Sequence, residues 1–388
     1  MRTVIFLLPF LTLRAADPTA AGVDRFGADF YRQLAHTPGN LVVSPFSNAA
    51  ALSMLLEGAR GQTAAQLAKV LHQNGGESGH AIAVAELLDR VTREANSQGG
   101  ELLTAQGLWL QRGFQIRGDF EQIMTRHYHA AATQLDFAGD PEQARAGINS
   151  WTSTHTKGKI PELFGPGSLA RSVTMVLTSA VYFHGPWQSA FRTESTSPAA
   201  FHTSGRETVQ APTMNQTGTF TYAETPAMQV LEMKYGKSPL VFDVLLPRNP
   251  EDLTKFETSL SPDILGGLWG SLADREVAVS LPRFRLDSDF SLRDILCNLG
   301  LSDAFSGAAD FSGIDDRRDL LLSDMRHKAF IEVGEQGTTA AAVTGSTVRL
   351  ISSTSPPVVF RADHPFLFFV RDPHTGVLLF AGRLASPK

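Results

Sequence analysis

The residues that could perform chemistry in this chain are its serines, its histidines and its single cysteine, and their spacing matches no catalytic motif. The sequence contains no Gly-x-Ser-x-Gly turn, no His-Glu-x-x-His helix and no Gly-x-Gly-x-x-Gly loop, which would indicate a serine hydrolase, a zinc peptidase or a nucleotide-binding fold. The nearest approach, Gly76-Glu77-Ser78-Gly79-His80, lacks the final glycine. Cys297 stands alone, which excludes an intrachain disulfide. We therefore expect no catalytic residue, no enzyme activity, no cofactor and no bound metal.

One segment near the C-terminus has a composition typical of neither a core element nor an ordinary linker. It begins at Glu335, and the small residues after Gly337 carry no charge until Arg349. In an extended segment, alternate side chains would form one small, uncharged face, which consists of Thr338, Ala340, Ala342, Thr344, Ser346 and Val348. Such a segment could slip between two existing strands, because large or charged inward side chains would clash or lose their hydration. Composition alone also fits a flexible surface loop.

The start of this segment resembles the hinge of the serpin reactive loop, whose pattern is Glu-x-Gly-Thr followed by small residues. The matching residues are Glu335, Gly337, Thr338, Ala340, Ala341 and Ala342. Further strings resemble serpins in family order from about residue 24 to 384, among them Asn40–Ser47, Gly58–Thr63, Asn149–Trp151, Thr156–Ile160, Phe183–Trp187, Leu281–Phe284 and Ala309–Gly313. On these matches the chain is identified as a member of the serpin (serine protease inhibitor) family, either a secreted bacterial-type serpin or another inhibitory one.

The resemblance implies an α+β serpin fold with three β-sheets, eight to nine helices and an exposed reactive-centre loop over about residues 335–359. It also implies a region where the strands of the main sheet part, formed by Ser44, Ser47, Ser179, Trp187, Arg283 and His327. Ser179 departs from the asparagine that the family usually has there, which leaves the hydrogen bonding of this region open. By the same resemblance, Glu335 should pair with Arg283 at the top of the sheet.

The function that the resemblance implies is irreversible inhibition of serine endopeptidases, with cysteine endopeptidases as a second class. The target would cleave the loop, and the freed loop would enter the main sheet while still bound as an acyl-enzyme. Family spacing places the reactive bond at Ile351–Ser352, sixteen residues after Glu335 and fourteen before Pro365. Ile351 suits an elastase-like or subtilisin-like protease. The alternative bonds follow Leu350, for a chymotrypsin-like enzyme, or Arg349, for a trypsin-like one.

The same resemblance leaves a second function open, in which a non-inhibitory serpin fold only binds, as a carrier or a chaperone. The intact hinge pattern favours inhibition, because no proline interrupts the run between Glu335 and Ser355. In an inhibitor, the small-residue face would lie in water until the loop is cut.

Composition and the N-terminus restrict the partners and the compartment. The 388 residues carry a formal net charge of −5 without a basic stripe, so we expect no binding to nucleic acid or to a membrane. Met1 and Arg2 precede a short apolar run, Thr3 to Leu13, which resembles a secretory signal peptide more than a buried strand and is too short to span a membrane. We expect a signal peptide over residues 1–20, a single domain over 21–388, a monomer, and an extracellular or periplasmic protein.

Local signals place the elements that must hold these residues. Ser44 and Pro45 predict the start of a helix, and Asp140 with Pro141 predicts another. Longer expected elements are strands over Ser172–Phe183, Val209–Tyr222, Val230–Pro247 with a turn at Tyr235, Val277–Leu286 and Leu320–Val333, a helix over Ser291–Gly300, and a buried C-terminal hairpin.

Overall fold

The computed structural model describes residues 17–73, 79–97, 99–130, 132–205, 207–338 and 356–387. The helices are α1 (Pro18–Leu34), α2 (Pro45–Gly58), α3 (Gly61–Val70), α4 (His80–Ser97), α5 (Gly118–Tyr128), α6 (Pro141–His155), α7 (Leu253–Ser259), α8 (Pro262–Gly270), α9 (Arg293–Asn298) and α10 (Ser312–Asp315). The strands are β1 (Leu41–Val43), β2 (Glu101–Gln111), β3 (Ala132–Leu135), β4 (Met175–Pro186), β5 (Ser197–His202), β6 (Thr208–Glu224), β7 (Met228–Lys234), β8 (Val241–Pro247), β9 (Ala273–Pro282), β10 (Phe284–Ser291), β11 (Leu322–Gly334), β12 (Gly337–Thr338), β13 (Val358–Arg361), β14 (Phe366–Arg371) and β15 (Leu378–Leu384).

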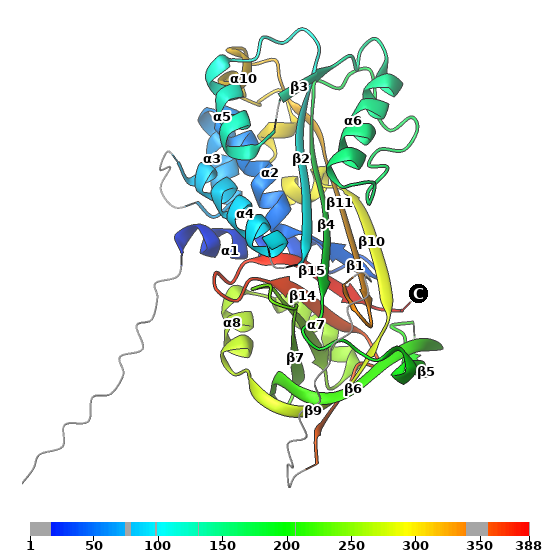
Figure 1. Ribbon diagram of the computed structural model, residues 1–388. Helices are drawn as coiled ribbons and strands as arrows, with labels where there is room; N and C mark the ends of the chain where they lie inside the picture. The colour runs from blue at the N-terminus through cyan, green and yellow to red at the C-terminus, as the bar shows by residue number, and fades with distance from the viewer. Residues whose placement is uncertain are drawn as a thin grey trace, which may run out of the picture.

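The main sheet has six strands in the order β10-β11-β12-β4-β2-β3. Helices α2 to α5 lie on one side of it, and α6 lies on the other (Figure 1). The alternation of side chains explains this arrangement: Leu108 and Leu177 face the large core, while Trp109 and Val176 pack with Ile148 of α6 in a smaller one. The main sheet is therefore buried on both faces over its central strands.

Helix α2 lies in the centre of the large core, as its apolar sequence predicts. Ser44 caps it by accepting a hydrogen bond from the Ser47 amide at 3.1 Å, and Pro45 occupies the first turn. Asp140 caps α6 in the same way by accepting from the Gln143 amide. Both predicted helix starts are confirmed, because each has a side-chain acceptor for an otherwise unpaired N–H.

The second sheet has nine strands, in the order β1-β15-β14-β8-β7-β6-β9-β13 with β5 paired to β6. Strand β6 pairs with β5 and β9 along most of its length and with β7 near its end. This long strand joins two of the expected three sheets into one hydrogen-bonded surface. The expected α+β class is confirmed by these sheets and helices, and the described part of the chain contains ten α-helices, one more than the upper expectation.

Two predicted elements differ from the structure. The expected strand Val277–Leu286 is divided at Arg283, because β9 pairs with β6 in the nine-stranded sheet whereas β10 pairs with β11 in the main sheet. The expected helix start at Ser291 is also wrong. Ser291 is the last residue of β10, and its hydroxyl donates to Asp324 at 2.6 Å instead of capping α9.

The N-terminal boundary expected at residue 20 falls inside α1. Asp17 caps this helix by accepting a hydrogen bond from the Thr19 amide, and Ala20 is buried. A leader that ends before Asp17 would leave the helix and its cap complete. Among the residues that the structure describes, no helix combines the length and hydrophobicity needed to cross a bilayer.

Helix α1 also carries a buried carboxyl group, that of Asp24. Burial raises its pKa to about 7, partly offset by a hydrogen bond from the Leu378 backbone and increased by the nearby Asp372. One oxygen of Asp24 has no hydrogen-bond partner within the described parts of the chain. The folded protein therefore binds a proton at Asp24 far more tightly than an unfolded chain does.

We expect Asp24→Asn to raise the melting temperature at pH 8. The folded pKa lies above the unfolded value near 4, so the contribution of Asp24 to stability is fully present below about pH 4 and is lost as pH rises through about 7. The loss corresponds to about 2–4 kcal/mol, or several degrees. Melting curves at pH 5 and pH 8 should show a larger gain at pH 8. Asp287→Asn, at an exposed carboxylate, is the matched control, and an equal gain at both pH values would contradict the assignment.

Candidate functional site: the sheet-opening region and the hinge

A hydrogen-bonded cluster joins α2 to the middle of the main sheet. His327 of β11 lies opposite Ser179 of β4, where these two strands pair in parallel. Its Nε2 accepts from the Ser44 amide at 3.0 Å, and its Nδ1 is 3.0 Å from the Ser179 carbonyl oxygen. The hydroxyls of Ser179 and Ser47 are 2.9 Å apart. The structure therefore brings together four residues that the sequence analysis assigned to the sheet-opening region.

His327 is neutral in this cluster. It is fully buried, and desolvation lowers its pKa to about 4 in spite of the hydrogen bond to the Ser179 backbone. Because Nε2 accepts a hydrogen bond from Ser44, the ring proton is on Nδ1, which donates to the Ser179 carbonyl. The bond between His327 and Ser179 thus links β11 to β4.

Gln106 of β2 extends the cluster and was missed by the sequence analysis. Its side-chain amide donates to the Ser47 hydroxyl at 2.7 Å, and its register partner on β4 is Ser179. A polar residue in the middle of a strand with four leucines, between Ala105 and Gly107, was the signal available in the sequence. The serine at position 179 therefore has partners on three sides: α2, β2 and β11.

The hinge begins as a short strand between β11 and β4. After a turn at Glu335 and Gln336, β12 pairs with β11 through Thr338 and Val333 and with β4 through Thr338 and Gly185. Thr338 is fully buried. The expectation that the whole small-residue face lies in water is wrong at this residue, because the sheet is already open by two residues at this end.

Two side chains hold Thr338 in place, one from β4 and one from the turn after β7. The Tyr235 hydroxyl is 2.7 Å from the Thr338 hydroxyl, and His184 Nδ1 is 2.6 Å from its carbonyl oxygen. Trp187 donates from its indole to the Gly334 carbonyl at 2.9 Å and stacks on Tyr235 with ring centres 4.7 Å apart. Trp187 was predicted, whereas the contributions of His184 and Tyr235 required the tertiary structure.

Glycine is the residue type that fits at position 337 of the hinge. Its φ of +143° is unfavourable for a side chain, and a Cβ built on it would lie 2.1 Å from the Gly185 carbonyl oxygen. The contact is with backbone, so a side chain cannot be accommodated by rotation of its neighbour. The glycine of the hinge pattern is required by the approach of β12 to β4.

The predicted contact between Glu335 and Arg283 is confirmed. Arg283 Nε lies 3.5 Å from one carboxylate oxygen of Glu335, and Thr196 donates to the other oxygen at 2.9 Å. The Glu335 side chain is 11% exposed and that of Arg283 is 50% exposed. At the turn before β12, Glu335 thus contacts both Arg283, between β9 and β10, and Thr196, just before β5.

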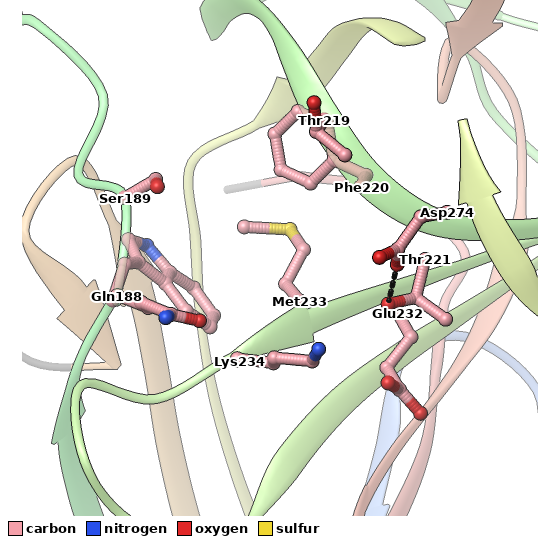
Figure 2. A pocket seen from close by; sticks show the side chains of 10 residues that line it. Gln188, Ser189, Thr219, Phe220, Thr221, Glu232, Met233, Lys234 and Asp274 are labelled. Carbon is pink, nitrogen blue, oxygen red and sulfur yellow. Dashed lines mark hydrogen bonds between the residues drawn. The ribbon is translucent and has the colours of Figure 1, made fainter. Parts of the chain in front are cut away.

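A small pocket lies beside Trp187, where the pairing of β6 with β7 ends and its pairing with β9 continues (Figure 2). Its volume is about 110 Å³. Figure 2 shows Met233 in the middle of the group and the hydroxyl of Thr221 bonded to Asp274. The described residues that line it include no histidine and no cysteine.

Comparisons with known proteins agree with this geometry. A family model described as serpin (serine protease inhibitor) matches residues 21–387. The chain belongs to the serpin family. This serpin is 37% identical over 381 residues to leukocyte elastase inhibitor of Bos taurus, with 95% of this chain and 99% of the relative covered. It is 36% identical to an uncharacterized serpin-like protein of Thermococcus kodakarensis, with 96% and 86% covered.

Solved serpin structures share the fold. A highly specific serpin of the insect Tenebrio molitor superposes with a TM-score of 0.86 at 31% identity, covering 95% of this serpin and 98% of that chain. Uncleaved ovalbumin superposes with a TM-score of 0.88 at 28% identity, covering 96% and 100%. The similarity therefore extends over nearly the whole of each chain.

Several predicted site residues of this serpin lie outside the described residues. They are the reactive bond Ile351–Ser352, its alternatives Arg349 and Leu350, and the hinge alanines Ala340, Ala341 and Ala342. Their roles stay predictions. Among the residues that are described, no group of three or more histidine, cysteine, aspartate or glutamate side chains is placed to hold a metal ion.

We expect Glu335→Lys to make this serpin polymerise faster on warming. Lysine would lose the contacts to Arg283 and Thr196 and would place two cations together, which weakens the turn before β12. Glu332→Lys makes the same change of charge three residues earlier, on β11, where no ion pair is described, and is the matched control. Light scattering at a fixed temperature measures the rate, and equal rates for Glu335→Lys and the unmodified protein would contradict the role of this contact.

Proposed function

We propose that this serpin is an irreversible suicide-substrate inhibitor of serine endopeptidases, with cysteine endopeptidases as a second target class. The observation that carries the proposal is the position of Gly337 and Thr338, which lie between β4 and β11 at the start of the uncharged small-residue run. A loop that begins inside the sheet needs no further nucleation step before it can extend into the sheet.

The topology favours further insertion. Below the hinge, β11 and β4 pair directly and in parallel, from Leu322 opposite Met175 to Phe330 opposite Tyr182. Strand β12 is antiparallel to both. An extended β12 would therefore replace one parallel ladder by two antiparallel ladders, which are slightly more stable for each residue. The gain in hydrogen bonds is the driving force that the proposal requires.

The mechanism begins with the protease acting on the loop as a substrate. The proposed bond is Ile351–Ser352, and cleavage would leave the protease attached as an acyl-enzyme to Ile351. The freed segment would then continue β12 down the sheet. At about 3.3 Å for each residue, fifteen inserted residues span roughly 50 Å. The attached protease would be carried along the molecule and distorted before it could deacylate.

The buried cluster around His327 sets where β4 and β11 must part. The His327 bond to Ser179 runs between these strands, while Ser44, the cap of α2, contacts His327 and Ser47, in the first turn of α2, contacts Ser179. An entering strand would break the bond between the strands and leave those from α2 available. Because the cluster is neutral, parting the strands leaves no buried charge without a partner.

The partner we propose is an elastase-like or subtilisin-like protease, which the branched side chain of Ile351 suits. Relatives of this serpin include proteins named leukocyte elastase inhibitor, which supports this class. Chymotrypsin-like cleavage after Leu350 and trypsin-like cleavage after Arg349 are the alternatives. Mass spectrometry of the products formed with a panel of proteases distinguishes the three bonds, and cleavage outside 349–352 would overturn the assignment.

We further propose that the protein is a secreted monomer, extracellular or periplasmic. The support is the apolar run over Thr3–Leu13 after one basic residue. Mass determination of the N-terminus of the exported protein would test this, with a first residue no later than Asp17 as the expected result.

The second candidate function is that of a non-inhibitory carrier or chaperone. The buried state of Thr338 fits a carrier equally well if the segment stops there. The two functions differ in what happens after the loop is cut, because a carrier has no need of further insertion.

We expect Thr338→Arg to convert the inhibitor into a substrate. The arginine would place a charge where Thr338 is fully buried and would remove the hydroxyl that meets Tyr235, at a cost of several kcal/mol. Insertion of the loop would slow, and hydrolysis of the acyl-enzyme would then be the faster step. Thr339→Arg, which alternation places on the opposite face, is the control. Gel analysis in denaturant measures the ratio of complex to cleaved protein, and an unchanged ratio for Thr338→Arg would rule out insertion through this hinge.

We expect cleavage within 348–355 to raise the melting temperature by tens of degrees. Cutting separates the small-residue run from its connection to β13. About fifteen residues could then gain ladder hydrogen bonds in the main sheet, at about 0.5–1.5 kcal/mol each before the entropy of ordering them. Melting curves before and after limited proteolysis provide the measurement. A cleaved form that melts at or below the intact form would favour the carrier.

A further inference from the structure

Two buried carboxylates lie directly opposite each other in the nine-stranded sheet. Glu232 of β7 is the register partner of Asp243 of β8, where the two strands pair in antiparallel. Both side chains are buried. Like charges at opposite positions of neighbouring strands repel each other, and burial strengthens the repulsion because little water screens it. The two carboxylates therefore need a cation, a proton or both to stay in the sheet.

One cation serves both carboxylates. Arg371 of β14 donates from Nε to Asp243 at 2.6 Å and from Nη2 to Glu232. Its guanidinium is buried and lies 4.4 Å from the centre of the Trp269 ring of α8. The second oxygen of Asp243 has no hydrogen-bond partner within the described parts of the chain. With both carboxylates ionised, the triad of Glu232, Asp243 and Arg371 would carry one uncompensated negative charge away from water.

The charged groups around the triad do not supply a second buried cation. Among the described residues of β7, β8, β14 and α8, the other charged side chains are those of Lys234 and Asp263, and both are exposed. Lys234 lines the small pocket of Figure 2 beside Glu232, and the opposite charge of Asp274 lies at the same pocket. Tyr235, just after β7, stays neutral, because burial raises the pKa of its phenol. The excess charge therefore has to be met within the triad.

A proton on the triad removes the excess charge. Burial raises the pKa of the Asp243 carboxyl to about 7, because the opposing effect of Arg371 is only partial and Glu232 adds to the rise. In an unfolded chain an aspartate is solvated and has a pKa near 4. The folded protein therefore holds about one proton at this place at pH values where the unfolded chain releases it.

We propose that the triad of Glu232, Asp243 and Arg371 is a proton-binding switch, which makes the nine-stranded sheet more resistant to unfolding in mildly acid surroundings than in alkaline ones. Because the folded pKa of Asp243 lies above the unfolded value, its contribution to stability is fully present below about pH 4 and is lost as pH rises through about 7. All three residues belong to the nine-stranded sheet. The switch therefore does not depend on whether the cut loop enters the main sheet.

The first test compares melting temperatures of the full chain at pH 5 and pH 8. Asp243→Asn keeps the size of the side chain and removes the excess charge, so it should melt several degrees higher than the unmodified protein at pH 8 and gain less at pH 5. Asp287→Asn, at an exposed carboxylate, is the matched control and should show no such difference. A melting temperature that Asp243→Asn lowers equally at both pH values would overturn the proton site.

The second test counts protons directly. Unfolding in urea at about pH 5.5, followed with a pH indicator in weak buffer, should release about one proton fewer from Asp243→Asn than from the unmodified protein. Asp24 also binds a proton in this range, but it is present in both proteins, so its proton cancels from the difference. An unchanged proton count would overturn the site.

The third test asks whether the two carboxylates share Arg371. Glu232→Gln leaves Arg371 paired with Asp243, so it should also raise the melting temperature at pH 8. The protein with both Glu232→Gln and Asp243→Asn would bury Arg371 without an anionic partner, and it should melt below either single variant at both pH values. A double variant that melts above both single variants would overturn the sharing of one guanidinium.

Discussion

The rest of this structure depends on the direct parallel pairing of β4 with β11. These two strands are neighbours along most of their length, yet at one end they are held apart by the two residues of β12. At that end the backbone groups of β4 and β11 pair with β12, and elsewhere the two strands pair with each other. Under the function proposed above, further insertion of the cut loop would replace the one ladder between β4 and β11 by two.

The side chains around this junction are neutral, which fits the opening of the sheet that the proposed function requires. The central cluster consists of serines, a glutamine and a histidine whose pKa is lowered by burial, so every member is neutral. Charged groups occur at the top of the sheet, where the buried Glu335 is paired with Arg283, whose side chain is half exposed. Hydrogen bonds to hydroxyls and amides can be exchanged for others as strands move, whereas a buried ion pair that loses one partner is costly.

The hinge shows how one backbone requirement organises several side chains. Gly337 passes so close to Gly185 that no Cβ fits, and this approach brings Thr338 under Tyr235 and beside His184. The Trp187 indole donates a hydrogen bond to the carbonyl of Gly334, the last residue before the turn. A residue with a side chain at position 337 would displace β12, and the contacts made by Thr338 would be lost with it.

The sequence by itself determined the family, the fold class, the capped starts of α2 and α6, the hinge pattern and the contact between Glu335 and Arg283. These features depend on local chemistry or on strings whose order along the chain is specific, so residue types were sufficient. The tertiary structure decided what depends on long-range pairing: the division of one expected strand at Arg283, the strand position of Ser291, the insertion of Thr338, and the roles of Gln106, His184 and Tyr235. Each of these residues is polar or aromatic in a segment with an ordinary strand pattern, and their partners lie on other elements. Periodicity shows which face a residue takes, but only the folded chain determines which residue it meets there.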